Sequence, residues 1–414
     1  MQQSLFRFFI KAVQNMKSKL VKFINKFYND FLFFVVWRLV FFFHALAPVD
    51  KKLVVFVASC DKTMPKEYRL LYEKAKENGY KCVCLYDRRT KNAGYFRRQY
   101  EKMKYGAEFQ RYYAKAKTTF LYEYYLPAFS HKPRKGARLV QLWHGCGAFK
   151  KFSYSTRDSK WGLESKLFDR YKVHKSYTDI IASGEYIVPQ YTEAFHADDG
   201  VIKVLGVPRT DVYFDQSFVN GQKEILLKAY PELSGKRLVL WAPTFRGNNM
   251  RSSYNDKAID FMKLAASLDD NTVFLIKLHP FASSVLTFSE EEKKAIDGKI
   301  INISDTVSTE TALCCADVVI TDYSSLIFEY ALLSRPMIFY AYDLDEYEKE
   351  RGFYYDYRSF VPGKIAKNTD ELIECIRNAE KDFDKAAVEN FKNKFMSACD
   401  GRSTERIFQQ LIAG

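Results

Sequence analysis

The feature that most constrains this chain is a regular alternation of short apolar runs and helical segments that begins near Lys52. "LVVFVA" at 53–58 is typical of a buried strand, and "PKEYRLLYEKAKENGY" at 65–80 opens with proline and ends in Asn-Gly, as a helix does. "KCVCLY" follows as a second strand. Strands that alternate with helices in this way predict βαβ units and a parallel sheet with helices on both faces.

A second alternating series starts at residue 235, and the 414 residues are enough for two or three domains. We therefore predict an α/β protein with two Rossmann-like domains, at 51–225 and 226–414, facing a cleft. The last helices, at 369–412, are expected to cross back onto the first domain. The strands of the second series are "LVLWAP", "TVFLIKLHP", "KIINIS", "DVVITDYSS" and "PMIFYAY".

Residues 1–50 have a different pattern. Apolar side chains recur at steps of three and four between Phe6 and Phe27, with basic residues on the other side of the helix. The apolar stretch that follows is broken by Arg38, which costs about 2.5–3.5 kcal/mol at the centre of a spanning helix. We predict amphipathic helices that attach to a membrane surface. Helices packed on the globular body, a true span or a signal peptide remain alternatives.

The net charge of +14 indicates an anionic partner, which could be nucleic acid, an acidic membrane or a phosphorylated substrate. The eight cysteines show no CxxC spacing, so we expect reduced thiols in a cytoplasmic compartment. No His/Asp/Glu cluster has metal-ligand spacing, and neither GxxxxGK[ST] nor GxGxxG occurs. These absences weaken metalloenzyme, kinase and dehydrogenase interpretations.

Polar or titratable side chains follow the ends of many strands, where ligands bind in parallel sheets. Serines near the start of a helix can complete an anion cradle, although serine is also a common helix cap. A histidine there can accept a proton or bind a phosphate, or it can be a buried core residue. Arginines there can grip phosphate oxygens or form surface salt bridges. These residues are His144, Ser183, Arg209, Thr244, Arg246, His279, Asp322, Ser324 and Ser325.

Five segments carry a family resemblance: "QLWHGCGAFKK", "GVPRTDVY", "LWAPTFRG", "IKLHP" and "DVVITDYSSLIFEYALLSRPMIFYAYDLDEYEKERGFYYDY". In this order, across 139–360, they resemble the signature blocks of the CDP-glycerol glycerophosphotransferases of teichoic acid synthesis. The resemblance implies a GT-B-like pair of Rossmann domains, attached peripherally to the cytoplasmic membrane face. It also implies transfer of glycerol phosphate or ribitol phosphate from CDP-glycerol or CDP-ribitol to a hydroxyl of an undecaprenyl-diphosphate-linked acceptor, with release of CMP. No cofactor and no nucleic-acid partner are implied.

The resemblance also implies roles for individual residues. His144 is the expected general base, with Gly145, Lys150 and Lys151 on the acceptor side. His279 is expected at the donor diphosphate, and Asp322 is expected to orient its loop, with Glu329 near the cytidine ribose. The residues expected to hold the donor phosphates are Arg209, Thr244, Arg246, Lys277, Ser324 and Ser325.

The chain departs from the family pattern at Cys146, Gly147 and Ala148, where a threonine and a proline-leucine continuation are usual, and at Phe281. These changes bear on the acceptor and leave every titrating group in place. Two rival interpretations remain, a GT-B glycosyltransferase that uses a nucleotide sugar and a non-enzymatic basic protein that binds membrane or nucleic acid. The sequence does not distinguish glycerol from ribitol or a primase from a polymerase.

Overall fold

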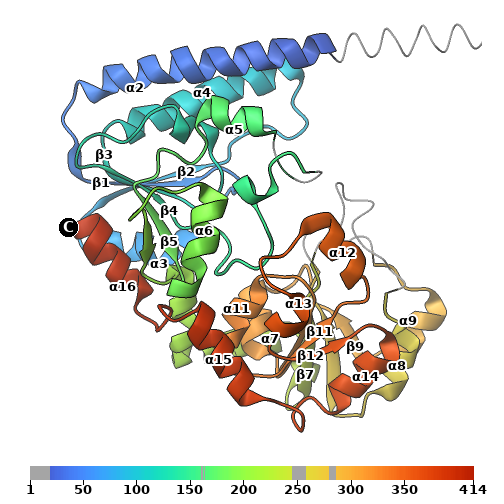
Figure 1. Cartoon of the computed structure of the whole chain (residues 1–414). Coiled ribbons are helices and arrows are strands. Elements are labelled where there is room, and N and C mark those ends of the chain that lie inside the picture. The colour runs from blue at the N-terminus through green and yellow to red at the C-terminus, as the bar shows by residue number, and fades with distance from the viewer. Residues whose placement is uncertain (1–18, 160–161, 163, 245–257, 279–285) are drawn as a thin grey trace, which may run out of the picture. The chain divides into compact units, whose positions relative to one another are not determined.

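The computed structural model describes residues 19–159, 162, 164–244, 258–278 and 286–414 (Figure 1). The chain forms two compact units. The first unit contains the residues up to Leu142, with 165–180 and 410–414, and the second contains 143–164 and 181–409. Strands and helices alternate along both series, and the paired strands run parallel, so the predicted α/β fold class is confirmed.

The first sheet has the strand order β2-β1-β3-β4-β5-β6. β1 pairs in parallel with both β2 and β3, so the strand order reverses there and forms a topological switch point. The predicted strand 53–58 is the buried part of β1. The strands are β1 (Asp50–Ala58), β2 (Lys81–Tyr86), β3 (Ala116–Leu121), β4 (Arg138–Gln141), β5 (Asp179–Ala182) and β6 (Ile202–Val204). The associated helices are α3 (Lys66–Glu77), α4 (Tyr95–Tyr113), α5 (Ser165–Tyr171) and α6 (Val188–Phe195).

The second sheet has the order β12-β11-β10-β7-β8-β9, the strand order of the doubly wound dinucleotide-binding fold. Its switch point lies between β7 and β10. The strands are β7 (Arg237–Trp241), β8 (Thr272–Ile276), β9 (Ile300–Asn302), β10 (Val318–Thr321), β11 (Met337–Tyr340) and β12 (Lys364–Ala366). The helices are α7 (Gln216–Ala229), α8 (Phe261–Ser267), α9 (Glu290–Ile296), α10 (Thr309–Cys315), α11 (Leu326–Ala331), α12 (Leu344–Arg351), α13 (Tyr357–Phe360), α14 (Thr369–Arg377), α15 (Lys385–Phe395) and α16 (Ser403–Ile407).

A 27-residue helix, Lys19–Ala45, precedes the first sheet and includes α2 (Trp37–Ala45). One face of this helix packs along α4 (Figure 1), where the fully buried Trp37 lies over Gly106. Length and composition alone would allow the helix to span a membrane. Its opposite face is apolar and exposed at Leu20, Val21, Phe23, Ile24, Phe27, Phe31, Phe34, Val35, Leu39, Phe42 and Phe43.

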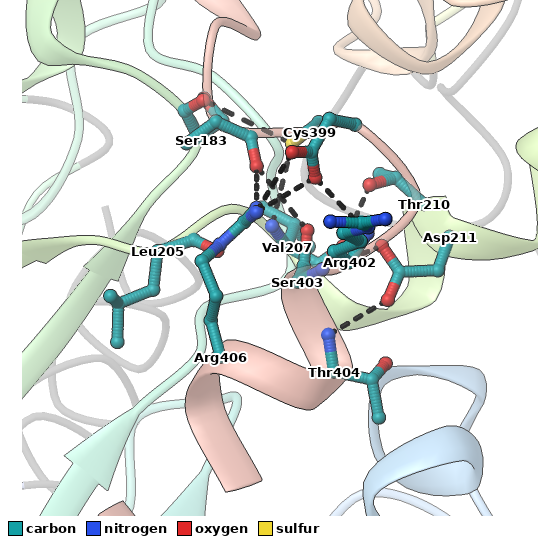
Figure 2. Close-up of polar contacts among 12 residues, drawn as sticks. Ser183, Leu205, Val207, Thr210, Asp211, Cys399, Arg402, Ser403, Thr404 and Arg406 are labelled. Atoms are coloured by element: carbon teal, nitrogen blue, oxygen red, sulfur yellow. Dashed lines mark hydrogen bonds and ion pairs between the residues drawn. The ribbon is translucent and has the colours of Figure 1, made fainter. Parts of the chain in front are cut away.

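Residues after α15 return to the loops that follow β5 and β6 (Figure 2). Arg406 donates to the carbonyl of Leu205 at 3.0 Å, and Asp211 accepts from the backbone N–H of Thr404 at 2.7 Å. Cys399 Sγ accepts from the N–H of Val207 at 3.4 Å. Side chains rather than strand pairing therefore hold this segment against the loop that contains Arg209.

We predict that Gly106→Ala loosens the packing of the N-terminal helix, because a Cβ atom there would lie 2.3 Å from Trp37 Nε1. Overpacking of this kind lowers the free energy of unfolding by about 1–3 kcal/mol. Gly221→Ala in α7 is the matched control, since nothing lies within 4 Å of its Cβ position. The control should gain about 1 kcal/mol from helix propensity. Urea unfolding measures both, and equal stabilisation by the two substitutions would contradict the packing.

Candidate active site

His144, the predicted general base, is exposed on the loop that follows β4. The preceding Trp143 has a φ of +58°, which is uncommon for a bulky residue. Its ring packs against Phe152 and Phe195, with centroids 5.0 and 5.3 Å away. Strained backbone persists only where its surroundings enforce it. The aromatic packing therefore fixes the backbone that carries the imidazole.

The residues that follow His144 lie against α11 of the second sheet. A Cβ atom at Gly147 would lie 2.5 Å from the ring of Phe328, so only glycine fits at this position. Cys146 is fully buried. The carbonyl of Gly145 accepts a hydrogen bond from Tyr191 Oη at 3.0 Å. The small residues that depart from the family pattern are thus the residues that allow close contact with α11.

Arg209 connects three parts of the site. Its guanidinium donates from Nε and Nη2 to the carboxylate of Glu329 at 3.1 and 3.2 Å, and from Nη2 to Cys146 Sγ at 3.1 Å. The side chains of Arg209 and Glu329 are only 2% and 6% exposed. The two side chains must keep this bidentate geometry, because a buried charge without its counter-ion is strongly destabilising. It joins the turn after β6, the His144 loop and α11.

The residues expected on the acceptor side continue this contact. Lys150 forms an antiparallel bridge with Phe353, and the N–H of Lys151 donates to the carbonyl of Gly352 at 3.1 Å. The N–H of Tyr354 donates to the carbonyl of Phe149 at 2.7 Å. The segment that starts at His144 therefore ends paired with the chain just after α12.

Thr244 and Asp322 meet at the switch point of the second sheet, after β7 and β10. The Asp322 carboxylate is buried and accepts from the backbone N–H groups of Thr244 and Tyr323 at 2.8 and 2.5 Å. Its carbonyl accepts from Tyr357 Oη at 2.9 Å. This geometry agrees with the predicted role of Asp322 in orienting its loop, and the role stays a prediction.

Ser324 and Ser325 lie at the start of α11 and are partly exposed. Ser324 Oγ accepts from the N–H of Leu326 at a long 3.4 Å. Ser325 is the N-cap residue, but within the described residues its side chain makes no capping hydrogen bond. The sequence left open whether these serines cap the helix or bind a ligand. The described part of the chain gives Ser325 no capping bond, and its contact with a ligand stays a prediction.

Lys277 has a local partner in the structure. Its ammonium donates to the carbonyls of Ser304 and Val307 at 2.6 and 2.7 Å, and burial lowers its pKa below the ordinary value. Lys277 thus holds the loop after β9, and its contact with donor phosphates stays a prediction. His279 and Arg246 lie outside the described residues.

Sequence reasoning missed an aromatic cluster beside the Asp322 loop. Tyr323 stacks on Tyr347 with centroids 3.9 Å apart and donates to Asp343 at 2.9 Å. Phe353 and Tyr357 pack on the same ring, 5.7 and 5.3 Å away. The run "GFYYDY" at 352–357 was the available signal, because four of its six residues are aromatic.

Comparison with known proteins identifies the family of this chain. A family model described as CDP-Glycerol:Poly(glycerophosphate) glycerophosphotransferase matches residues 39–413. The chain belongs to this family. The family predicted from the five sequence blocks is therefore confirmed.

Two relatives in Bacillus spizizenii illustrate the membership. The chain is 34% identical over 364 residues to a teichoic acid ribitol-phosphate primase, covering 88% of this chain and 91% of the primase. It is 39% identical over 302 residues to a teichoic acid poly(ribitol-phosphate) polymerase, covering 73% of this chain and 47% of the polymerase. This chain thus spans about half the length of that polymerase.

A solved structure of the wall teichoic acid polymerase TagF matches with a TM-score of 0.73 and 23% identity. The match covers 98% of this chain and 97% of that one. It confirms the GT-B-like fold class of this glycerophosphotransferase family member.

We predict that Arg209→Ala destabilises the protein by about 3–5 kcal/mol, because it leaves the buried Glu329 carboxylate without its counter-ion. Urea unfolding measures the change. Arg358→Ala is the control, since it removes an exposed pair with Asp345 and should cost no more than about 1 kcal/mol. A double Arg209→Met/Glu329→Met variant should recover most of the lost stability. Equal losses in Arg209→Ala and in the control would show that the buried pair is not a structural element.

Proposed function

We propose that this protein transfers a polyol phosphate from a CDP-linked donor to a hydroxyl of a lipid-linked, teichoic-acid-like acceptor. The observation that carries the proposal is the family match over 39–413, which includes every element of the site described above. The contact between the His144 loop and α11 supports it, because it joins the expected base to the expected donor side.

In the proposed reaction, His144 removes the proton of the acceptor hydroxyl, and its oxygen attacks the phosphorus that bears the polyol. A new phosphorus–oxygen bond forms to the acceptor while the bond to the bridging oxygen of the diphosphate breaks. CMP leaves with that electron pair. Phosphoryl transfer depends mainly on positioning and charge stabilisation, and a well-placed base adds about 10²–10⁴-fold. The start of α11 and Ser325 would bind the departing CMP.

We propose ribitol phosphate as the transferred group. Relatives named for ribitol phosphate are 34–39% identical to this chain in the Bacillus spizizenii examples, whereas a Bacillus subtilis glycerol-phosphate primase is 28% identical. A polyol longer than glycerol would give the site more hydroxyl groups to recognise.

We propose that the enzyme attaches to a membrane through the exposed face of helix Lys19–Ala45. The large apolar side chains on that face are 36–69% exposed, with Phe23 at 69% and Phe27 at 68%. Lys22, Lys26 and Arg38 are exposed on the same helix, which suits an anionic surface. The opposite face packs on α4, so the helix lies along the unit rather than projecting from it. The cytoplasmic face is the side on which CDP-linked donors would be met.

The wild-type protein should release CMP from CDP-ribitol in the presence of a lipid-linked acceptor, with a slower reaction from CDP-glycerol. His144→Ala should lower the rate of CMP release by about 10²-fold or more, because the attacking hydroxyl loses its base. Chromatography of the nucleotide and mass spectrometry of the acceptor measure both results.

His196→Ala is the control, since His196 ends α6 and its ring packs on Tyr154, with centroids 4.9 Å apart. It should keep near-normal turnover. Near-normal turnover of His144→Ala would remove His144 from the role of base. Release of UDP or GDP from a nucleotide sugar, with none from either CDP-polyol, would favour the glycosyltransferase alternative.

A Phe27→Glu/Phe43→Glu variant should bind anionic vesicles at least tenfold more weakly than the wild type, since each exposed ring contributes about 1.5–3 kcal/mol when it enters an apolar phase. Ile225→Glu on α7 is the control and should bind normally. Flotation with vesicles measures binding. Carbonate should release the wild-type protein from membranes, and resistance to both carbonate and high salt would contradict surface attachment.

A further inference from the structure

The first unit contains a cavity of about 770 Å³ that the proposed reaction does not use. It lies beyond the carboxyl ends of β1 and β2, with Ser59 and Asp87 in its wall, and extends to Tyr124 after β3. This is the switch point of the first sheet, the place where doubly wound folds bind ligands. The cavity is within the size range of small-molecule sites. Its position therefore suits a ligand rather than a packing defect.

The carboxylates that line the cavity already have partners. Each one accepts hydrogen bonds from a neighbouring cation or from backbone and hydroxyl groups, so none needs a cation from outside. The pairs are Asp87 with Arg89, Glu108 with Arg88, and Glu101 with Arg97 and Thr90.

Two further cations of α4 line the same cavity, Arg98 and Lys102. Within the described residues, no carboxylate pairs with either of them. The Lys102 ammonium donates to Asn29 Oδ1 at 2.5 Å, a neutral partner, and burial lowers the pKa of this lysine. An anion in the cavity would restore the charge balance around Lys102. The lining thus has a positive charge that the protein itself does not neutralise.

Another part of the cavity wall is the helix Lys19–Ala45, through Asn25, Asn29 and Trp37. The exposed apolar face of this helix is on the other side from these residues. An α-helix with its side chains is about 10–12 Å across. A group bound in the cavity would therefore lie about one helix diameter from the apolar face, at the depth of lipid headgroups when that face enters a membrane.

We infer that this cavity binds the phosphate headgroup of a membrane lipid, through Arg98 and Lys102, beside the helix that attaches the enzyme to the membrane. The inference rests on the proposed membrane attachment and not on the transfer chemistry. A phospholipid and a polyprenyl phosphate both carry the required group. Aromatic residues in the lining, such as Tyr86 and Tyr105, offer apolar surface to the part of the lipid next to the phosphate.

The test is binding of the full-length protein to three kinds of vesicle in 0.5 M NaCl. The vesicles contain phosphatidylcholine alone, or phosphatidylcholine with 10 mol% of phosphatidylglycerol or of undecaprenyl phosphate. High salt screens exposed charges more than partly buried ones. The variant is Arg98→Gln/Lys102→Gln. Its control is Lys104→Gln/Arg111→Gln, which removes two exposed cations from the same helix outside the cavity.

We expect at least one phosphate lipid to tighten binding of the wild type and the control about tenfold over phosphatidylcholine alone, and the variant to lose that gain. The lipid that tightens binding shows whether the bound phosphate belongs to a phospholipid or to a polyprenyl phosphate. Equal loss in variant and control would overturn the inference, because general surface charge would then explain the binding. Inorganic phosphate that abolishes the gain at 1 mM would also overturn it, in favour of a free-phosphate site. Binding to phosphatidylcholine alone reports attachment through the apolar face separately.

Discussion

The buried ion pair between Arg209 and Glu329 is the interaction on which the site depends. It fixes the turn after β6, the loop that carries His144, and α11 of the second sheet, because one guanidinium binds Glu329 and Cys146 together. Substitution of either residue of such a deeply buried pair is expected to be strongly destabilising, since it leaves an uncompensated charge. The pair is better described as a clamp that sets geometry than as a source of net stability.

The chemistry of the site follows from that clamp and from the two sheets. In the second sheet, Asp322 ties the loops after β7 and β10 to each other at the switch point. Ser325 lies at the start of α11. Phe328 in the same helix contacts the His144 loop at Gly147, and Glu329 is linked to that loop through Arg209. Because α11 is only six residues long, a contact at Phe328 is one turn away from Ser325. A small shift of α11 would therefore move both the contact with the His144 loop and the position of Ser325.

Much of the fold could be predicted from the sequence because its signals are local. The apolar run at 53–58 and the strand before Asp322 are buried strands, as periodicity indicated. The positions of Thr244 and Asp322 at strand ends were also predictable, since parallel sheets collect such residues at one edge. The family itself followed from ordered blocks such as "VVITDYSS", and the match over 39–413 confirms it.

The partners of individual side chains could not be predicted. Arg209 and Glu329 are 120 residues apart, and nothing local indicates that they bind each other rather than a ligand. Lys277, next to the "HP" block, was likewise predicted to bind phosphate. Its hydrogen bonds to two backbone carbonyls depend on the tertiary structure and could not be predicted locally. The amphipathic character of the N-terminal helix was visible in its periodicity. The surface it packs on was not.

The hydrogen bond from Thr118 Oγ1 in β3 to the carbonyl of Leu411 joins residues 293 positions apart in one buried contact of the first unit. During synthesis the strand therefore emerges from the ribosome long before its partner exists. Contacts of such long range slow folding, and incomplete surfaces are exposed in the meantime. For this chain the buried hydroxyl of Thr118 gains its partner only after the second sheet has been synthesised, so the first unit is completed last.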